Sequence, residues 1–180
     1  MENKTKWVID PAHSEIAFKV KHLMITNVKG HFKMFDATVF TEDSDFSKAE
    51  VSFKMDTSSV DTGSPDRDTH LKSSDFFDVE KYKEILYTSK KVERQDEENF
   101  KMSGDLTIKG ITKPVDLDVE FGGIVKDPWG NEKAGFAISG KINRKDWNLL
   151  WNVAIESGGF LVGDDVNINC EVQMLKPKDH

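Results

Sequence analysis

The sequence has little of several things that would fix its class at once. A single cysteine, Cys170, excludes a disulfide within the chain. No window approaches the roughly 20 consecutive apolar residues that a transmembrane helix needs, so stable membrane insertion is not expected. Positive charge is outnumbered, with 25 lysines and arginines against 32 aspartates and glutamates and a formal net charge of −7. Nucleic acid is therefore not an expected partner, because binding phosphates needs a basic surface.

Several enzyme signatures are missing as well. The sequence contains no G-x-S-x-G nucleophile elbow, no Walker A loop and no G-x-G-x-x-G fingerprint. His13-Ser14-Glu15 matches the H-x-E of zinc deaminases, but the P-C-x-x-C that completes that signature is absent. One cysteine and five scattered histidines give no usual zinc spacing. We therefore name no catalytic residue, no metal ligand and no cofactor.

The N-terminal segment has no apolar run after its charged residues, so it does not read as a signal peptide. As written, the chain is expected in the cytoplasm. A periplasmic location would follow if a signal had been removed ahead of this sequence.

What the sequence does contain is repeated alternation of apolar and polar residues, which predicts β-strands. Short turns such as residues 109–113 and 127–131 favour antiparallel order with one apolar face. Cys170 falls in the last alternating segment and is expected to be a buried small hydrophobic residue. The eight predicted strands cover about residues 15–21, 28–41, 49–55, 85–92, 100–108, 115–121, 134–142 and 165–175.

Two architectures fit these strands: a sandwich, and an eight-stranded barrel. A phase change at Met34-Phe35 predicts a β-bulge, which helps a long strand to curl. Long, bulged strands that contain glycine favour closure. We therefore expect an all-β chain, a single domain over residues 1–180, folded as an extended eight-stranded antiparallel barrel with one or two short helices.

Alternation alone leaves open whether the barrel is solid or hollow, because small inward residues also suit packing of large against small. Two irregular segments, residues 64–78 and 143–163, favour a cavity. Both are rich in large apolar side chains, although irregular segments are usually polar. The first predicts a short helix with Asp66 as its N-cap, ending on Phe76-Phe77. The second carries helical spacing over Trp147–Ala154, and is either a plug of the barrel mouth or an apolar rim.

The motifs in the chain resemble those of the YceI-like family of bacterial polyisoprenoid-binding proteins. The similarity covers nearly the whole chain in order. Two departures are Asn148, where relatives usually have glycine after the aromatic residue, and Lys83-Glu84, where a proline is common. The segments that carry the resemblance are residues 10–14 (DPAHS) with Ile16 and Phe18, His22-Leu23, 28–32 (VKGHF), 67–73 (RDTHLKS), 75–78 (DFFD), 104–115 (GDLTIKGITKPV), 142–147 (INRKDW) and 162–164 (VGD).

The resemblance implies a lipocalin-like barrel whose interior holds a long isoprenoid or fatty-acyl-type lipid. It implies a binding protein for transport, storage or sequestration, and not an enzyme. We expect Phe76-Phe77 to cover the interior as part of a lid. The expected ligand-binding residues of the pocket or rim are Phe18, Val20, Phe32, Phe53, Leu71, Phe76, Phe77, Leu106, Phe136, Ile138, Trp147 and Leu150.

Two alternatives stay open at this stage. One is a lipid-modifying enzyme that uses His70 or His22 with a nearby acid, although the sequence names neither a nucleophile nor an orienting group. The other is a structural, stress-related module with a filled core. The sequence does not determine the lipid or its head group, a carrier or a storage role, or whether two barrels pair as a homodimer.

Overall fold

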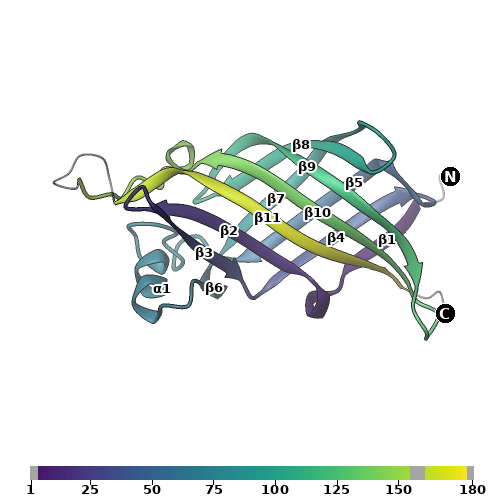
Figure 1. The fold of residues 1–180 in the computed structure, drawn as a ribbon, viewed down its shortest axis with the longest axis horizontal. Coiled ribbons are helices and arrows are strands. Elements are labelled where there is room, and N and C mark those ends of the chain that lie inside the picture. The colour runs from purple at the N-terminus through teal and green to yellow at the C-terminus, as the bar shows by residue number, and fades with distance from the viewer. Residues whose placement is uncertain (1–3, 155–160, 178–180) are drawn as a thin grey trace.

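The computed structural model describes residues 4–154 and 161–177. It contains one α-helix, α1 (Pro65–Lys72), and short 3₁₀ turns at Pro11–His13, Thr57–Ser59 and Arg144–Trp147. No helix in the described part of the chain is long and apolar enough to span a bilayer. The strands are β1 (Lys4–Ile9), β2 (Glu15–His22), β3 (Thr26–Phe32), β4 (Phe35–Glu42), β5 (Asp45–Asp56), β6 (Val60–Asp61), β7 (Glu84–Arg94), β8 (Asn99–Ile108), β9 (Ile111–Lys126), β10 (Glu132–Asn143) and β11 (Val162–Lys176) (Figure 1).

The sheet closes on itself, because β11 pairs with β10 on one side and with β2 and β1 on the other. β1 and β2 act as one long strand interrupted by the turn at residues 11–13, and β3 and β4 act as another. With β5 and β7 to β11 these make eight long strands, all antiparallel to their neighbours. The predicted eight-stranded antiparallel barrel is confirmed, and the sandwich is not formed.

The phase change predicted near Met34 is where β3 gives way to β4. Lys33 N donates to Ser59 O at 3.1 Å, and Asp56 N donates to Met34 O at 2.9 Å, so the chain exchanges one partner for another at this point. Beyond it, β3 pairs only with the two-residue strand β6 on that side. The bend therefore leaves room between β3 and β7 for the segment that contains α1.

One end of the barrel is filled by its own side chains. Trp7, Thr41, Ala134 and Met174 are almost completely buried there. The Trp7 Nε1–H donates to Thr41 Oγ1 at 3.0 Å, and the Thr41 hydroxyl donates to the Asp43 carbonyl at 2.6 Å. The indole therefore packs as a plug with its polar atom satisfied, as buried tryptophan requires. We call this the closed end.

α1 lies at the opposite end (Figure 1). Its N-cap is Ser64, whose hydroxyl accepts from Arg67 N, and Pro65 fills the first helical position. The prediction that Asp66 caps the helix is wrong, because the N-cap is Ser64, two residues earlier, and proline suits the first helical position. The chain then folds back, with Phe77 N donating to Leu71 O at 2.9 Å.

The second irregular segment forms a single 3₁₀ turn and no longer helix. Arg144–Trp147 ends at Asn148, which adopts a left-handed conformation with φ 60°. The helical spacing over Trp147–Ala154 therefore forms no helix beyond this turn. Asparagine tolerates this conformation better than most residues, which explains how it replaces the family's glycine here. Residues 155–160 of the same predicted segment lie outside the described residues.

The plug at the closed end yields a stability prediction. Trp7→Phe removes the donor to Thr41 and part of the buried ring, so we expect it to lower the free energy of unfolding by about 1–3 kcal/mol. Phe40→Leu, on an outward and partly exposed position of β4, should change it by less than about 0.5 kcal/mol. Urea unfolding monitored by circular dichroism measures both. An equal effect of the two substitutions would contradict the role given to the plug.

Candidate functional site

The interior of the barrel contains a cavity of about 550 Å³. Inward side chains from all eight long strands line it, and nearly all of them are apolar. It extends from Val39 and Phe46, close to the closed end, to His70 and Trp151 near α1. A volume of this size is within the usual range for small-molecule pockets.

The burial pattern of β5 shows that the middle of the barrel is hollow. Ala49, Val51, Phe53 and Met55 alternate with exposed polar residues and point inward, yet all four are only partly buried. Phe136 and Ile138 of β10 behave in the same way. Apolar side chains that face the inside and still have accessible surface border empty space, so the solid-core arrangement is not the one formed.

The charged residues of the lining are found only at the α1 end, which is therefore where the cavity opens. They come from β2 (Lys21 and His22), from α1 (Asp66, Arg67 and His70) and from the turn that carries Arg144. The closed end contributes no charged side chain to the lining. The α1 end is therefore the place where we expect a ligand to enter and leave.

The structure places ten of the twelve predicted site residues in the cavity wall. Trp147 lies outside the lining: it is 2 % exposed, and its Nε1–H donates to the Leu106 carbonyl at 3.0 Å, so it packs between the turn and β8. Leu150 is 54 % exposed and does not line the cavity. Ligand contact remains a prediction for the ten that line the cavity, which are Phe18, Val20, Phe32, Phe53, Leu71, Phe76, Phe77, Leu106, Phe136 and Ile138.

The predicted lid is organised around His70. Its Nε2 lies 2.9 Å from Asp75 Oδ2, which joins α1 to the segment that follows it. Its ring meets Trp151 edge-on with centroids 4.4 Å apart, and Phe76 in the same manner at 5.1 Å. Phe77 in turn contacts Phe32 of the wall, with centroids 5.9 Å apart. The histidine therefore links α1 to the chain between β10 and β11 across the opening.

Arg144 fixes the other side of the opening. Its side chain is buried, and it donates to the carbonyls of Leu149, Trp151 and Gly163, the last at 2.8 Å. Burial lowers the pKa of the guanidinium, and Asp164 at 3.9 Å offsets this only in part. Arg144 belongs to the segment INRKDW, but its role could not be predicted from the sequence, because a strand pattern cannot show that a cation folds back onto carbonyls.

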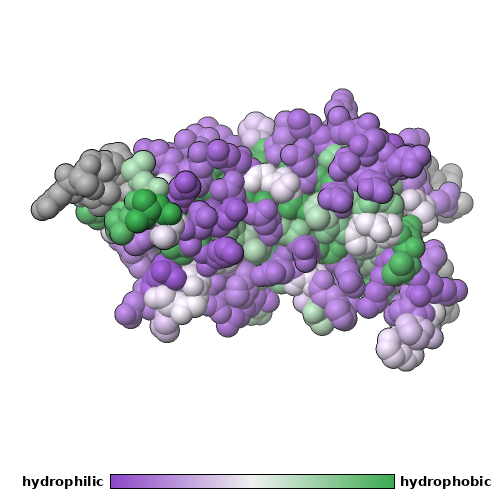
Figure 2. All heavy atoms as spheres, viewed as in Figure 1, coloured by the Kyte–Doolittle hydropathy of each residue, from purple (hydrophilic) through white to green (hydrophobic). Residues whose placement is uncertain are grey.

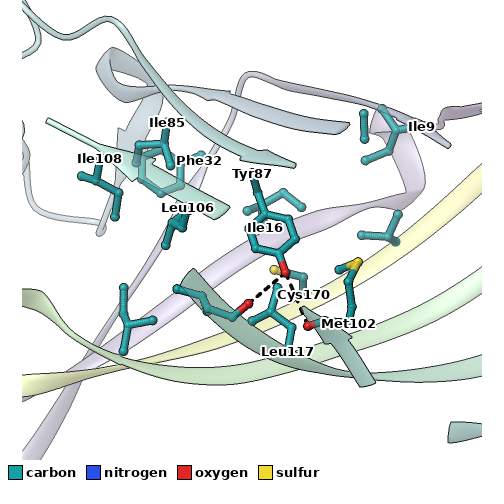
Figure 3. Packing of buried hydrophobic residues seen from close by; sticks show 14 of the residues in the cluster. Ile9, Ile16, Phe32, Ile85, Tyr87, Met102, Leu106, Ile108, Leu117 and Cys170 are labelled. Carbon is teal, nitrogen blue, oxygen red and sulfur yellow. Dashed lines mark hydrogen bonds between the residues drawn. The ribbon is translucent and has the colours of Figure 1, made fainter. Parts of the chain in front are cut away.

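Two polar groups in the wall, Tyr87 and Cys170, were not predicted as site residues (Figure 3). The Tyr87 hydroxyl donates to the Val115 carbonyl at 3.1 Å, and its burial raises the pKa of the phenol. Cys170 is buried, as expected, and burial raises the pKa of its thiol to about 11. Tyr87 comes two residues after the buried Ile85 in β7, so strand alternation could have predicted that its side chain points inward. Neither group is activated for nucleophilic chemistry.

No group of three or more histidine, cysteine or carboxylate side chains that could hold a metal occurs within residues 4–154 and 161–177. In the same ranges every buried side-chain nitrogen or oxygen has a hydrogen-bond partner. The wall therefore offers an apolar surface with its polar atoms already satisfied, and the chemistry it suits is burial of hydrocarbon.

The raised pKa of Cys170 predicts a pH dependence of stability. The unfolded chain loses the thiol proton near the ordinary pKa of 9.0, whereas the folded chain keeps it up to a pKa of about 11, so stability falls as pH rises through this window. Between about pH 8 and about pH 10 we expect wild type to lose roughly 1 kcal/mol more than Cys170→Ala, which lacks the group. Urea unfolding at both pH values measures this. Identical pH slopes for the two proteins would contradict it.

Comparison with known proteins identifies the family of the chain. The YceI-like domain matches residues 7–174. A UPF0312 protein of Staphylococcus aureus is 39 % identical over 170 residues, which cover 94 % of this chain and 96 % of that protein. The crystal structure of the Campylobacter jejuni YceI protein has a TM-score of 0.74 at 36 % identity, and the match covers 88 % of this chain and 90 % of that one.

More distant structures share the fold. Burkholderia cenocepacia BcnA aligns with a TM-score of 0.76 at 21 % identity, covering 92 % of this chain and 98 % of that chain. A polyisoprenoid binding domain from Saccharophagus degradans aligns with a TM-score of 0.68 at 14 % identity, covering 95 % and 98 %. Since the family match spans most of the sequence and the barrel is that of its relatives, the chain belongs to the YceI-like family.

Proposed function

We propose that the protein binds the hydrocarbon chain of a polyisoprenoid or similar amphiphilic lipid in the barrel and performs no chemistry on it. The observation that carries the proposal is the cavity of about 550 Å³ with its largely apolar lining. The polyisoprenoid binding domain of Saccharophagus degradans, which has the same fold, supports an isoprenoid as the ligand class. Carrying, storing or sequestering such a lipid would each use the same cavity.

The cavity volume limits how much of the chain can be enclosed. A water molecule occupies about 30 Å³ of liquid, and a carbon with its hydrogens is of similar size, so the cavity holds roughly 18 carbons, or three to four prenyl units. Burying each five-carbon unit contributes roughly 3–4 kcal/mol before ordering is subtracted. A longer chain would leave its remaining units and its head group at the opening.

We expect the protein to recognise its lipid through the hydrocarbon tail and not through the head group. The Tyr87 hydroxyl already donates to a backbone carbonyl, and the Arg144 donors are directed at the carbonyls of the rim. Because these groups gain nothing from a ligand oxygen, they impose no head-group chemistry inside the barrel. Length and branching of the hydrocarbon are left as the main determinants of fit.

The His70 environment favours a lid over a catalytic centre. A general base needs a nucleophile or a substrate proton within hydrogen-bond reach. The hydrogen-bond partner of the His70 ring among the described residues is Asp75, and its edges are packed by Trp151 and Phe76. The imidazole is thus engaged in joining segments, which supports a non-enzymatic function.

Mass spectrometry of organic extracts tests the binding. Purified wild type should yield about one lipid per chain, with an isoprenoid or fatty-acyl chain. Val51→Trp places an indole in the hollow and should lower the bound lipid several-fold, since it fills space that the ligand needs. Ser52→Trp, on the outward face of the same strand, should retain it. Absence of stoichiometric lipid from wild type, or equal lipid in both variants, would overturn the cavity as the site.

The lid is tested by the rate at which a fluorescent isoprenoid analogue leaves the barrel. His70→Ala removes the bond to Asp75 and two ring contacts, together worth about 1–3 kcal/mol, so release should accelerate about tenfold. His70→Phe keeps the ring contacts, so its release rate should lie between the rates of His70→Ala and wild type. His13→Ala, which also removes a histidine–aspartate pair but outside the cavity lining, should release at the wild-type rate. Lipid turnover that disappears in His70→Ala while binding persists would establish an enzyme instead.

A further inference from the structure

The turn between β2 and β3 has a backbone geometry that is unfavourable for its two central residues, Leu23 and Met24. Ile25 N donates to His22 O at 3.2 Å, and the two central residues of this turn, Leu23 and Met24, have φ values of 52° and 61°. Positive φ at both central positions is the pattern of a type I′ turn, which strongly prefers Asn-Gly. Bulky residues are strained in this conformation. The β8–β9 hairpin of the same protein has Lys109-Gly110 at the equivalent positions.

These strained residues are also exposed. Leu23 is 39 %, Met24 58 % and Ile25 80 % exposed. Leu23 N donates to Leu161 O and Leu161 N donates to Val153 O, both at 2.9 Å, so the half-exposed Val153 continues the same surface. We call Leu23, Met24, Ile25 and Val153 the apolar tip. Figure 2 shows hydrophobic surface at the end of the barrel where Figure 1 places the β2–β3 connection.

The apolar tip adjoins the opening of the cavity. Lys21 and His22, the residues that precede it, line the cavity. Leu161 and Val162, the first described residues after position 160, line it as well. His22 pairs with Val162 across the β2–β11 ladder. An exposed apolar patch beside the only charged part of a lipid cavity's lining needs a partner, and its position restricts which partner suits it.

Charge around the apolar tip is reversed relative to the rest of the protein. Residues 16–35 contain four lysines and no aspartate or glutamate, in a chain with net charge −7. Lys19 and Lys29 lie directly opposite each other in the β2–β3 ladder, an arrangement that is unfavourable between like charges. Lys19, Lys21 and Lys29 have no ion pair with any described residue. Asp164 and Asp165 on the neighbouring strand are paired with Lys145 and Lys141, at 3.3 Å each.

We propose that this hairpin docks the barrel on an anionic phospholipid bilayer, with the apolar tip among the acyl chains and Lys19, Lys21 and Lys29 at the head groups. An amphipathic element of this kind lies in the interface and does not span the membrane. Basic residues near an anionic surface add to its affinity. Docking presupposes the proposed lipid cargo, because it brings the opening of the cavity against the phase in which an isoprenoid dissolves.

Vesicle flotation tests the docking. Delipidated wild type should float with phosphatidylcholine vesicles that contain phosphatidylglycerol, and less with phosphatidylcholine alone. Leu23→Asn combined with Met24→Gly should lower the floated fraction at least tenfold, because it removes most of the inserted surface. Lys19→Gln, Lys21→Gln and Lys29→Gln should each weaken binding to the anionic vesicles about fivefold. Val125→Asn removes an exposed apolar residue of β9 at the closed end and should float as wild type does.

The double substitution keeps the test independent of folding. Asn-Gly suits a type I′ turn, so the variant should unfold at the wild-type temperature or above it. Val51→Trp should float normally although its cavity is blocked, so that failure of cargo binding and failure of docking are distinguished. Flotation of the Leu23→Asn, Met24→Gly variant at the wild-type level would overturn the proposal. If that variant also loses self-association in analytical ultracentrifugation, the apolar tip joins two copies of the chain instead.

Discussion

The whole architecture depends on the pairing of β11 with β2 and β1, which turns a sheet of eight long strands into a closed barrel. Closure removes the sheet edges and fixes the circumference, and eight strands leave an interior that is either filled by side chains or holds one small ligand. The outcome is then decided by the inward residues. Phe18 covers its cross-strand partner Gly30, where an added Cβ would lie 2.5 Å from the ring, so at this position a large residue packs on a small one within the wall.

The two ends of the barrel differ: one is filled by side chains, and the other is covered by α1 and the residues that follow it. At the closed end the ring of Trp7 is buried against Phe46, with centroids 5.3 Å apart, and its donor is taken up by Thr41. At the α1 end the wall between β3 and β7 is replaced by α1 and the phenylalanines that follow it. Closing an opening with a helix and a few ring contacts is weaker than closing it with a hydrogen-bonded sheet, so this is the part of the barrel that can move without unfolding the rest.

Sequence alone predicted most of the strands, their antiparallel order and the resemblance to a family of hollow barrels, but it missed β1 and joined β3 and β4 into one strand. It succeeded because alternation reports which face a residue occupies, as in Val51 and Ser52. Trp147 lies in an irregular segment, where no alternation indicates the direction of a side chain, and it packs against β8 instead of lining the cavity. The N-cap and the orientation of Arg144 depend on contacts between segments far apart in sequence, such as Arg144 with Gly163, which no local pattern encodes.

The charged lining residues gather at the α1 end, so this opening is where we expect exchange of a ligand to be controlled. His70 and its ring partners lie on one side of this opening, and the β2–β3 hairpin lies beside Lys21 and His22 on another. That hairpin combines two locally unfavourable choices, Leu23-Met24 in a turn made for Asn-Gly and lysine opposite lysine in the ladder. A sequence that otherwise agrees with its fold tends to break such rules at functional sites. Their coincidence beside the opening is more readily explained by contact with a lipid surface than by the stability of the barrel, which both choices reduce.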